Sequence, residues 1–395
     1  MRITFWIAGL IWIFVSSCSN TDYVDAVPRK SRFVASFDAK EASGIKSQLV
    51  LKAVLHFKNW HNTGLDLSER FYGFESPQGY YGFCACVADE EQLAEQLVKL
   101  GSRVEDYRAC RFAQVGEGWL AGFNDRSFLL MGPVTLERMG SLKHTMAKYL
   151  AQKEEEGIRA SRLYARLDSI QAPIAWVGRL SSLPAKIAMP LSLGMPRDAA
   201  PDDVFWAAGM RIDKHILHIT GETYALNPAL QQRLQQGKQC LRPIQGLWSG
   251  LLATPSNNCL FLNAEGPSLL ALLRENKDFR TLLLGANMQV EMDDMLRSVD
   301  GDVAIMQHPG KEGHHDLCLL AQSSHNDSLC CYGIDREKGE AIMKHPATEK
   351  WMQQIIGARM AIVTTLPEME NTMGNGLPFL RQLLGHVRHI VIVMK

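Results

Sequence analysis

Residues 70–87 read RFYGFESPQGYYGFCACV, and this stretch decides the fold. Aromatic and small residues fill two short runs, 70–74 and 80–87, and the residues between them, Ser-Pro-Gln-Gly at 76–79, favour a turn. Two strands joined by so short a turn run antiparallel. The stretch therefore predicts a β-hairpin.

A helix is predicted directly after this hairpin. Asp89 stands where an N-cap residue belongs, and Gln92 follows three positions later, so that it can reach back to the cap. Leucines recur on one face from Leu93 to Leu100, and Gly101 then ends the pattern. These signals predict a helix from Asp89 to Leu100.

Pairs of predicted strands recur along the chain instead of single strands that alternate with helices. This pattern favours an α+β fold over a doubly wound parallel sheet, and we expect repeated strand-helix-strand-strand units with mostly antiparallel sheets and helices packed on one face. Further strands are predicted at 32–38, 107–114, 118–123, 127–131, 174–178, 204–212, 216–224, 259–263, 303–307, 317–322 and 389–394, and further helices at 45–55, 135–150, 158–167, 268–273 and 378–384.

The N-terminal residues MRITFWIAGLIWIFVSSC resemble a bacterial lipoprotein signal peptide. Arg2 supplies the positive start, and the uncharged run 3–15 is shorter than the about 20 residues that a helix needs to cross a bilayer. The sequence VSSC at 15–18 resembles a lipobox, in which the cysteine becomes the lipidated first residue. We therefore predict lipidation at Cys18; an ordinary secretory signal with a coincidental cysteine is the alternative.

The domain organisation follows from these signals. We predict a signal peptide at 1–17, a polar tether at 18–31 and an N-terminal α+β domain at 32–165. A C-terminal α+β region fills 166–395, and a break near residue 250 would divide it into two units.

The overall charge excludes one class of partner. The chain carries 42 Lys and Arg residues against 42 Asp and Glu residues, so no net field attracts nucleic acid. The predicted partners are the membrane, through the lipid anchor, and an envelope protein or glycan. No cofactor is expected.

Eight cysteines follow Cys18, and their pairing cannot be read from the sequence. Cys84 and Cys86 lie two residues apart in an apolar strand, which places both thiols on one face of a sheet. No second pair follows at zinc-finger spacing, so buried free thiols are favoured over a metal site there.

Histidines form two groups that could hold a metal ion. His308, His314, His315 and Asp316 fall in a glycine-rich loop between two strands, where a solvated hairpin tip is the favoured interpretation. His386 and His389 lie near the end of the last predicted helix, where they can interact with its dipole. We predict no metal site.

Carboxylates concentrate between residues 291 and 302. Paired carboxylates can perform acid and base catalysis, as in glycosidases, but helix-end and turn chemistry explains these positions better. In particular, Asp300-Gly301-Asp302 is predicted to be a turn before a strand. The group comprises Glu291, Asp293, Asp294, Asp300 and Asp302.

Common catalytic motifs are missing from the sequence. It contains no GxSxG, no GxxxxGK[ST], no HExxH and no CxxC, so catalytic residues stay unassigned. Tryptophans could stack on sugars, but they are scattered and a structural role is favoured for them. They include Trp60, Trp119, Trp176, Trp206, Trp248 and Trp351.

Five segments resemble landmarks of an uncharacterised envelope lipoprotein family that is abundant in Bacteroides-type bacteria, a domain-of-unknown-function family numbered four-eight-three-six. The resemblance covers most of the chain and implies a fold and an envelope location, but it supplies no catalytic residues. The segments are YVDAVPRKSRFVASFD (23–38), GLDLSERFYGF (64–74), GYYGFCACVAD (79–89), GFNDRSFLLMG (122–132) and DGDVAI (300–305).

These observations favour a binding or structural role over an enzymatic one. We expect a lipid-anchored protein of the cell envelope, at the outer membrane and facing either the periplasm or the cell surface, that acts as a binding or structural module. The alternative is an envelope hydrolase that acts on glycan or peptide.

Overall fold

The computed structural model describes most of the chain in two compact units, the first ending at Ala165 and the second beginning at Arg166. The predicted helices at 45–55 and 378–384, the signal peptide and Cys18 lie outside the described residues. The described residues are 21–38, 63–213, 215–247, 258–277, 279–281, 283, 291–309, 315–323, 329–332, 337, 352–365 and 387–395.

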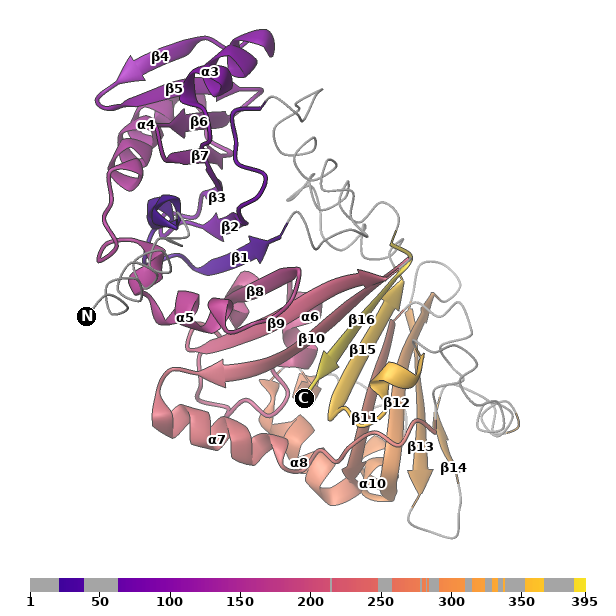
Figure 1. The fold of residues 1–395 in the computed structure, drawn as a ribbon. Helices are drawn as coiled ribbons and strands as arrows, with labels where there is room; N and C mark the ends of the chain where they lie inside the picture. The colour runs from indigo at the N-terminus through magenta and orange to yellow at the C-terminus, as the bar shows by residue number, and fades with distance from the viewer. Residues whose placement is uncertain are drawn as a thin grey trace, which may run out of the picture. The chain divides into compact units, whose positions relative to one another are not determined.

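Unit 1 is built on an antiparallel sheet (Figure 1). Every neighbouring pair of its strands is antiparallel, and the predicted hairpin at 70–87 is confirmed as β2 and β3. In spatial order the strands are β1 (Phe33–Phe37), β2 (Phe71–Glu75), β3 (Tyr81–Cys86), β7 (Ser127–Gly132), β6 (Trp119–Phe123), β5 (Cys110–Val115) and β4 (Val104–Tyr107).

The helix predicted after the hairpin is confirmed as α3 (Glu90–Lys99). Asp89 Oδ1 accepts a hydrogen bond from the backbone N–H of Gln92 at 2.9 Å, as an N-cap residue does. Leu93 and Leu97 are buried, so the leucine face packs inward. The other helices of unit 1 are η1 (Asp22–Ala26), α4 (Leu136–Leu150) and η2 (Ile158–Ala160), and α5 (Arg162–Asp168) crosses the boundary between the units.

The strand predicted at 107–114 is wrong in one respect: the structure divides it into β4 and β5. A two-residue turn joins Tyr107 to Cys110, and Arg108 adopts a positive φ of 57° in it. Glycine is favoured at such a position because it lacks a Cβ. Since arginine stands there instead, the sequence carried no turn signal.

The predicted tether is also corrected by the structure. Residues Asp22–Ala26 form the short helix η1, and Tyr23, Val24 and Val27 are buried in unit 1. The apolar side chains of this segment fill the core of the unit, so the folded domain begins earlier than residue 32.

Among the strands of unit 2, one pair is parallel. The long hairpin β9–β10 confirms the strands predicted at 204–212 and 216–224. In spatial order the strands are β8 (Ile174–Arg179), β9 (Val204–Asp213), β10 (Ile216–Ala225), β16 (His389–Met394), β15 (Met360–Thr365), β11 (Asn258–Glu265), β12 (Val299–Pro309), β13 (His315–Ser323) and β14 (Leu329–Tyr332), and β10 runs parallel to β16.

The α-helices of unit 2 pack on one face of its strands (Figure 1), whereas Ile355 of the short helix η6 belongs to the buried cluster on the other face. Leu262 on β11 lies in a buried cluster with Leu269 of α8 and Leu296 of α10, whereas its neighbour Phe261 belongs to a different buried cluster. Successive residues of a strand point to opposite faces, so the sheet is apolar on both sides. The helical segments are η3 (Leu180–Ser182), α6 (Ala185–Leu191), α7 (Pro228–Lys238), α8 (Gly266–Glu275), α10 (Met292–Arg297) and η6 (Met352–Ile355).

The fold is therefore α+β with mostly antiparallel pairing, as predicted. None of the helices among the described residues has the length and apolar character that crossing a membrane requires.

Candidate functional site

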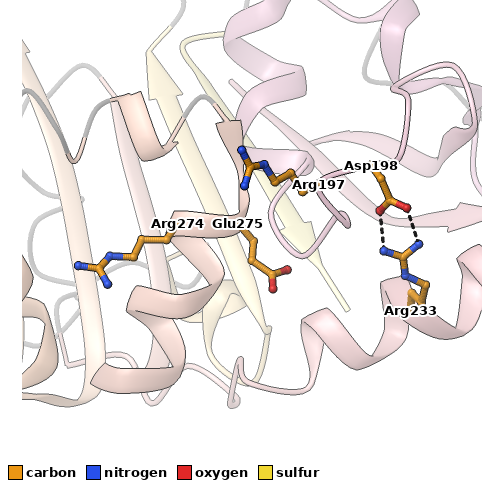
Figure 2. A pocket seen from close by; sticks show the side chains of 5 residues that line it. All are labelled: Arg197, Asp198, Arg233, Arg274 and Glu275. Carbon is orange, nitrogen blue, oxygen red and sulfur yellow. Dashed lines mark hydrogen bonds and ion pairs between the residues drawn. The ribbon is translucent and has the colours of Figure 1, made fainter.

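An open hollow of about 580 Å³ on unit 2 is the candidate site. Three segments that are distant in the sequence line it (Figure 2). Arg197 and Asp198 come from the loop between α6 and β9, Arg233 comes from α7, and Arg274 and Glu275 come from the end of α8. The lining is thus arginine-rich.

The residues next to these side chains in the sequence place them at the surface. Asn227 caps α7 by accepting a hydrogen bond from the backbone N–H of Ala229 at 2.9 Å, and Leu234 points into the core. Arg233, the neighbour of this buried leucine, is consequently exposed. On α8 the buried leucines end at Leu273, which leaves the last turn of the helix to charged residues.

Arg233 and Asp198 form a bidentate ion pair. The two guanidinium nitrogens of Arg233 donate to the two carboxylate oxygens of Asp198 at 3.0 and 2.5 Å. These hydrogen bonds hold the pKa of Asp198 below its usual value. Asp198 therefore stays ionised at neutral pH.

The other two arginines of the hollow differ from Arg233. Arg274 pairs with Asp293 of α10, and its guanidinium points away from the Asp198 side of the hollow (Figure 2). Arg197 is exposed and makes no hydrogen bond or ion pair with the residues that the structure describes. It is the cation of the hollow that is available to a ligand.

This arrangement suits the binding of an anion. Arginine presents a planar fork of N–H donors that matches a carboxylate or phosphate group. Among the described residues that line the hollow there is no serine, cysteine or histidine that could act as a nucleophile. The residues that line the hollow are three arginines and two carboxylates.

The predicted carboxylate group is not brought together as a catalytic pair. Three of its carboxylates form ion pairs, each with a different arginine. Glu291 is the residue before the first residue of α10. The pairs are Asp293 with Arg274, Asp294 with Arg297 and Asp300 with Arg242.

Asp302 has a structural role, and the predicted turn at 300–302 is wrong because these residues belong to β12. The buried carboxylate of Asp302 accepts hydrogen bonds from the consecutive backbone N–H groups of Gln245, Gly246 and Leu247 at 2.7–2.9 Å. It thereby fixes the loop that precedes β11.

The predicted histidine groups are only partly described. His308 on β12 is the register partner of Asp316 on β13. His314 and His386 lie outside the described residues. His389 begins β16. Within the described ranges no three His, Cys, Asp or Glu residues are grouped so that they could hold a metal ion.

Cys84 and Cys86 are buried free thiols, which confirms that prediction. Burial raises the pKa of Cys84 well above its usual value, so its thiol stays protonated. Trp206 is buried in the core and cannot stack on a ligand, while Trp60, Trp248 and Trp351 lie outside the described residues.

No sequence pattern distinguishes Arg197, and none distinguishes a second arginine with unusual geometry, Arg108. Arg108 Nη2 lies 3.2 Å from Nδ1 of His144, and its guanidinium lies over the ring of Tyr107. Both arginines are isolated in loops and belong to no motif. Only their spatial neighbours distinguish them.

Two solved structures have a weak likeness to this chain. One of them, "Structure of crystal form I of TP0453", is 9% identical; the match covers 57% of this chain and 88% of that chain and has a TM-score of 0.35. "Structure of crystal form IV of TP0453" is 8% identical, covers 49% and 76%, and gives a TM-score of 0.30.

No curated protein matches the chain. Residues 19–309 match the family described as "Domain of unknown function (DUF4836)". This match confirms the family number that the sequence resemblance gave, and the chain belongs to that family.

Proposed function

We propose that this protein is a lipid-anchored binding protein of the cell envelope and that the arginine-lined hollow of unit 2 receives an anionic group of its ligand. The observation that carries the binding role is Arg197, an exposed guanidinium in a hollow whose neighbouring arginines already have carboxylate partners.

Two observations support the anchor. The residues before Cys18 have the pattern of a lipobox, and the part of the chain that matches the family begins at residue 19, directly after that cysteine. The outer membrane is the proposed location, with the protein facing the periplasm or the cell surface.

The hollow supports binding better than hydrolysis. A general acid must carry a proton near the working pH, but the Arg233 guanidinium holds the pKa of Asp198 below its usual value. The paired carboxylate is therefore a poor proton donor, and its role is to orient Arg233.

The ligand group is a carboxylate or a phosphate, since both match the guanidinium fork. An acidic envelope glycan or an acidic segment of an envelope protein can present such a group. Inorganic phosphate, glucuronate and a glutamate-rich peptide are probes that separate these sources.

The test is calorimetric titration of the purified chain with each of the three probes. A hydrogen-bonded charge contact contributes about 1.5–3 kcal/mol, so Arg197→Gln should weaken binding of the preferred probe by roughly 10-fold to 100-fold. Arg103→Gln removes the same charge from a residue of unit 1 that is 89% exposed, and it should have little effect. Absence of binding, or equal losses in both variants, would contradict the proposal.

A further inference from the structure

Arg159 holds the first described residues of the chain against unit 1. Its Nε donates to Oδ1 of Asp25 at 2.8 Å, its Nη1 to Oγ1 of Thr21 at 3.1 Å, and its Nη2 to Oδ1 of Asp22 at 3.0 Å. The Asp25 side chain is only 4% exposed. A buried ion pair of this kind is costly to break, because one charge would be left without its partner.

Backbone contacts fix the same segment over its whole length. Pro28 forms a β-bridge with Gly157, and the N–H of Ile158 donates to the carbonyl of Val27 at 2.9 Å. The hydroxyl of Tyr23 donates to the carbonyl of Arg70 at 2.6 Å. From Thr21 onward, therefore, the chain has no freedom to act as a spacer.

Only Ser19 and Asn20 separate Cys18 from Thr21. Three residue steps span at most about 11 Å when fully extended. The lipid chains of an acylated cysteine lie in the hydrocarbon core, and the headgroup layer above that core is about 5–8 Å thick. Most of the available reach is therefore consumed within the headgroups.

We infer that unit 1 lies directly on the lipid headgroups, with the surface around Thr21 and Arg159 facing the membrane. This inference rests on the proposed lipidation of Cys18. The exposed charged residues of this surface, which we call the anchor face, are Asp22, Arg29, Lys30, Lys153, Glu154, Glu155 and Glu156.

The anchor face carries both signs of charge, four acidic and three basic side chains. Each Lys or Arg near an anionic bilayer contributes about 1 kcal/mol, and the acidic residues oppose that attraction. The contact is thus imposed by the short connection to the lipid and not by electrostatic attraction. A chain without the lipid should not bind even anionic vesicles.

Depth-dependent quenching tests the inference. A fluorophore on Glu154→Cys, at a side chain that is 67% exposed on the anchor face, is compared with one on Arg103→Cys, beside the edge strand β4. The full lipidated protein is reconstituted in phosphatidylcholine vesicles that contain a headgroup-spin-labelled lipid. We expect quenching at least twofold stronger at position 154 than at position 103.

The controls separate this inference from the proposed anchor. If the lipidated protein does not float with the vesicles, the anchor itself is wrong. If it floats but the two labels are quenched equally, the anchor stands and the inference is overturned.

A spacer variant gives a second and independent readout. Ten Gly and Ser residues inserted between Asn20 and Thr21 add a mean span of about 16–19 Å without touching the Arg159 contacts. Flotation should be unchanged, and quenching at position 154 should fall toward the value at position 103. Quenching that survives the spacer would mean that unit 1 binds the headgroups by its own affinity, which contradicts a contact imposed by short reach.

Discussion

Asn263 and Asp302 face each other across β11 and β12, and the side-chain amide of Asn263 donates to Oδ1 of Asp302 at 2.8 Å. Both residues are buried. Burying a carboxylate costs free energy unless it accepts hydrogen bonds. Besides the amide of Asn263, the backbone N–H groups of residues 245–247 donate hydrogen bonds to Asp302. The pair therefore joins the sheet of unit 2 to the loop before it.

Replacing this carboxylate should destabilise the protein strongly. Asp302→Ala leaves the buried amide of Asn263 and the part-buried N–H groups of residues 245–247 without this acceptor. A buried donor without an acceptor costs about 1–3 kcal/mol. We expect the free energy of unfolding to fall by roughly 3–5 kcal/mol in urea denaturation. Asp300→Asn, which breaks the exposed pair with Arg242, should change it by less than about 1 kcal/mol. Comparable effects would contradict this role for Asp302.

The leucine face of α3 supplies a second prediction. Leu97 is buried, so Leu97→Ala should lower the free energy of unfolding by roughly 2–5 kcal/mol, whereas Glu95→Ala, on the exposed side of the same helix, should change it by less than about 0.5 kcal/mol. Thermal and urea denaturation measure both. A small effect of Leu97→Ala would show that this helix face is not packed.

The elements that could be predicted from the sequence are those with strong local signals. Helix α3 has its cap and leucine period, and strand β16 is a continuous apolar run that was predicted at its observed residues. The turn at Arg108 and the strand position of Asp302 could not be predicted, because arginine gives no turn signal and Asp-Gly-Asp gives a false one.

The hollow on unit 2 could not be predicted from the sequence, for a different reason. Its residues come from a loop and two helices that only the tertiary fold brings together, and an isolated arginine in a loop has no distinguishing pattern. The repeat of strand-helix-strand-strand units stays a prediction. So does the lipidation of Cys18, which lies outside the described residues.

The positive φ of Arg108 leads to a third prediction. A residue with a Cβ in the left-handed region costs about 1 kcal/mol or more relative to glycine. Arg108→Ala keeps this cost and loses the contacts with His144 and Tyr107, whereas Arg108→Gly loses the contacts and relieves the cost. The glycine variant should therefore be about 1 kcal/mol more stable than the alanine variant. An alanine variant of equal or greater stability would show that the turn is unstrained.

His218 on β10 makes the stability pH-dependent. Its ring nitrogens are buried and have no hydrogen-bond partner among the described residues, and burial lowers its pKa below the ordinary 6.5, with Arg211 adding to this effect and Asp213 opposing it. The unfolded chain thus binds a proton at pH values where the folded protein does not. Stability should fall as the pH drops below about 6.5.

The measurement is the free energy of unfolding at pH 7.5 and at pH 5.5. His218→Leu should reduce the difference between the two values, because it removes the group that titrates. Thr220→Ala, which changes an exposed side chain of β10 that does not titrate, should leave the difference unchanged. If the wild-type protein, the His218 variant and the control variant all show the same difference, a group other than His218 causes the pH dependence of stability.

Membrane attachment is tested most directly at Cys18. Cys18→Ala removes the thiol that the lipid would modify, so the variant should lose incorporation of a labelled fatty acid and should leave the detergent-soluble membrane fraction. A single acyl chain binds membranes only reversibly, and stable attachment needs more than one, so the multiply acylated cysteine of a lipoprotein should hold the wild-type protein firmly. Substituting Cys110, a buried thiol of unit 1, with alanine is the matched control and should leave both the label and the fractionation unchanged. Retention of Cys18→Ala in the membrane fraction, together with an undiminished label, would rule out this cysteine as the anchor.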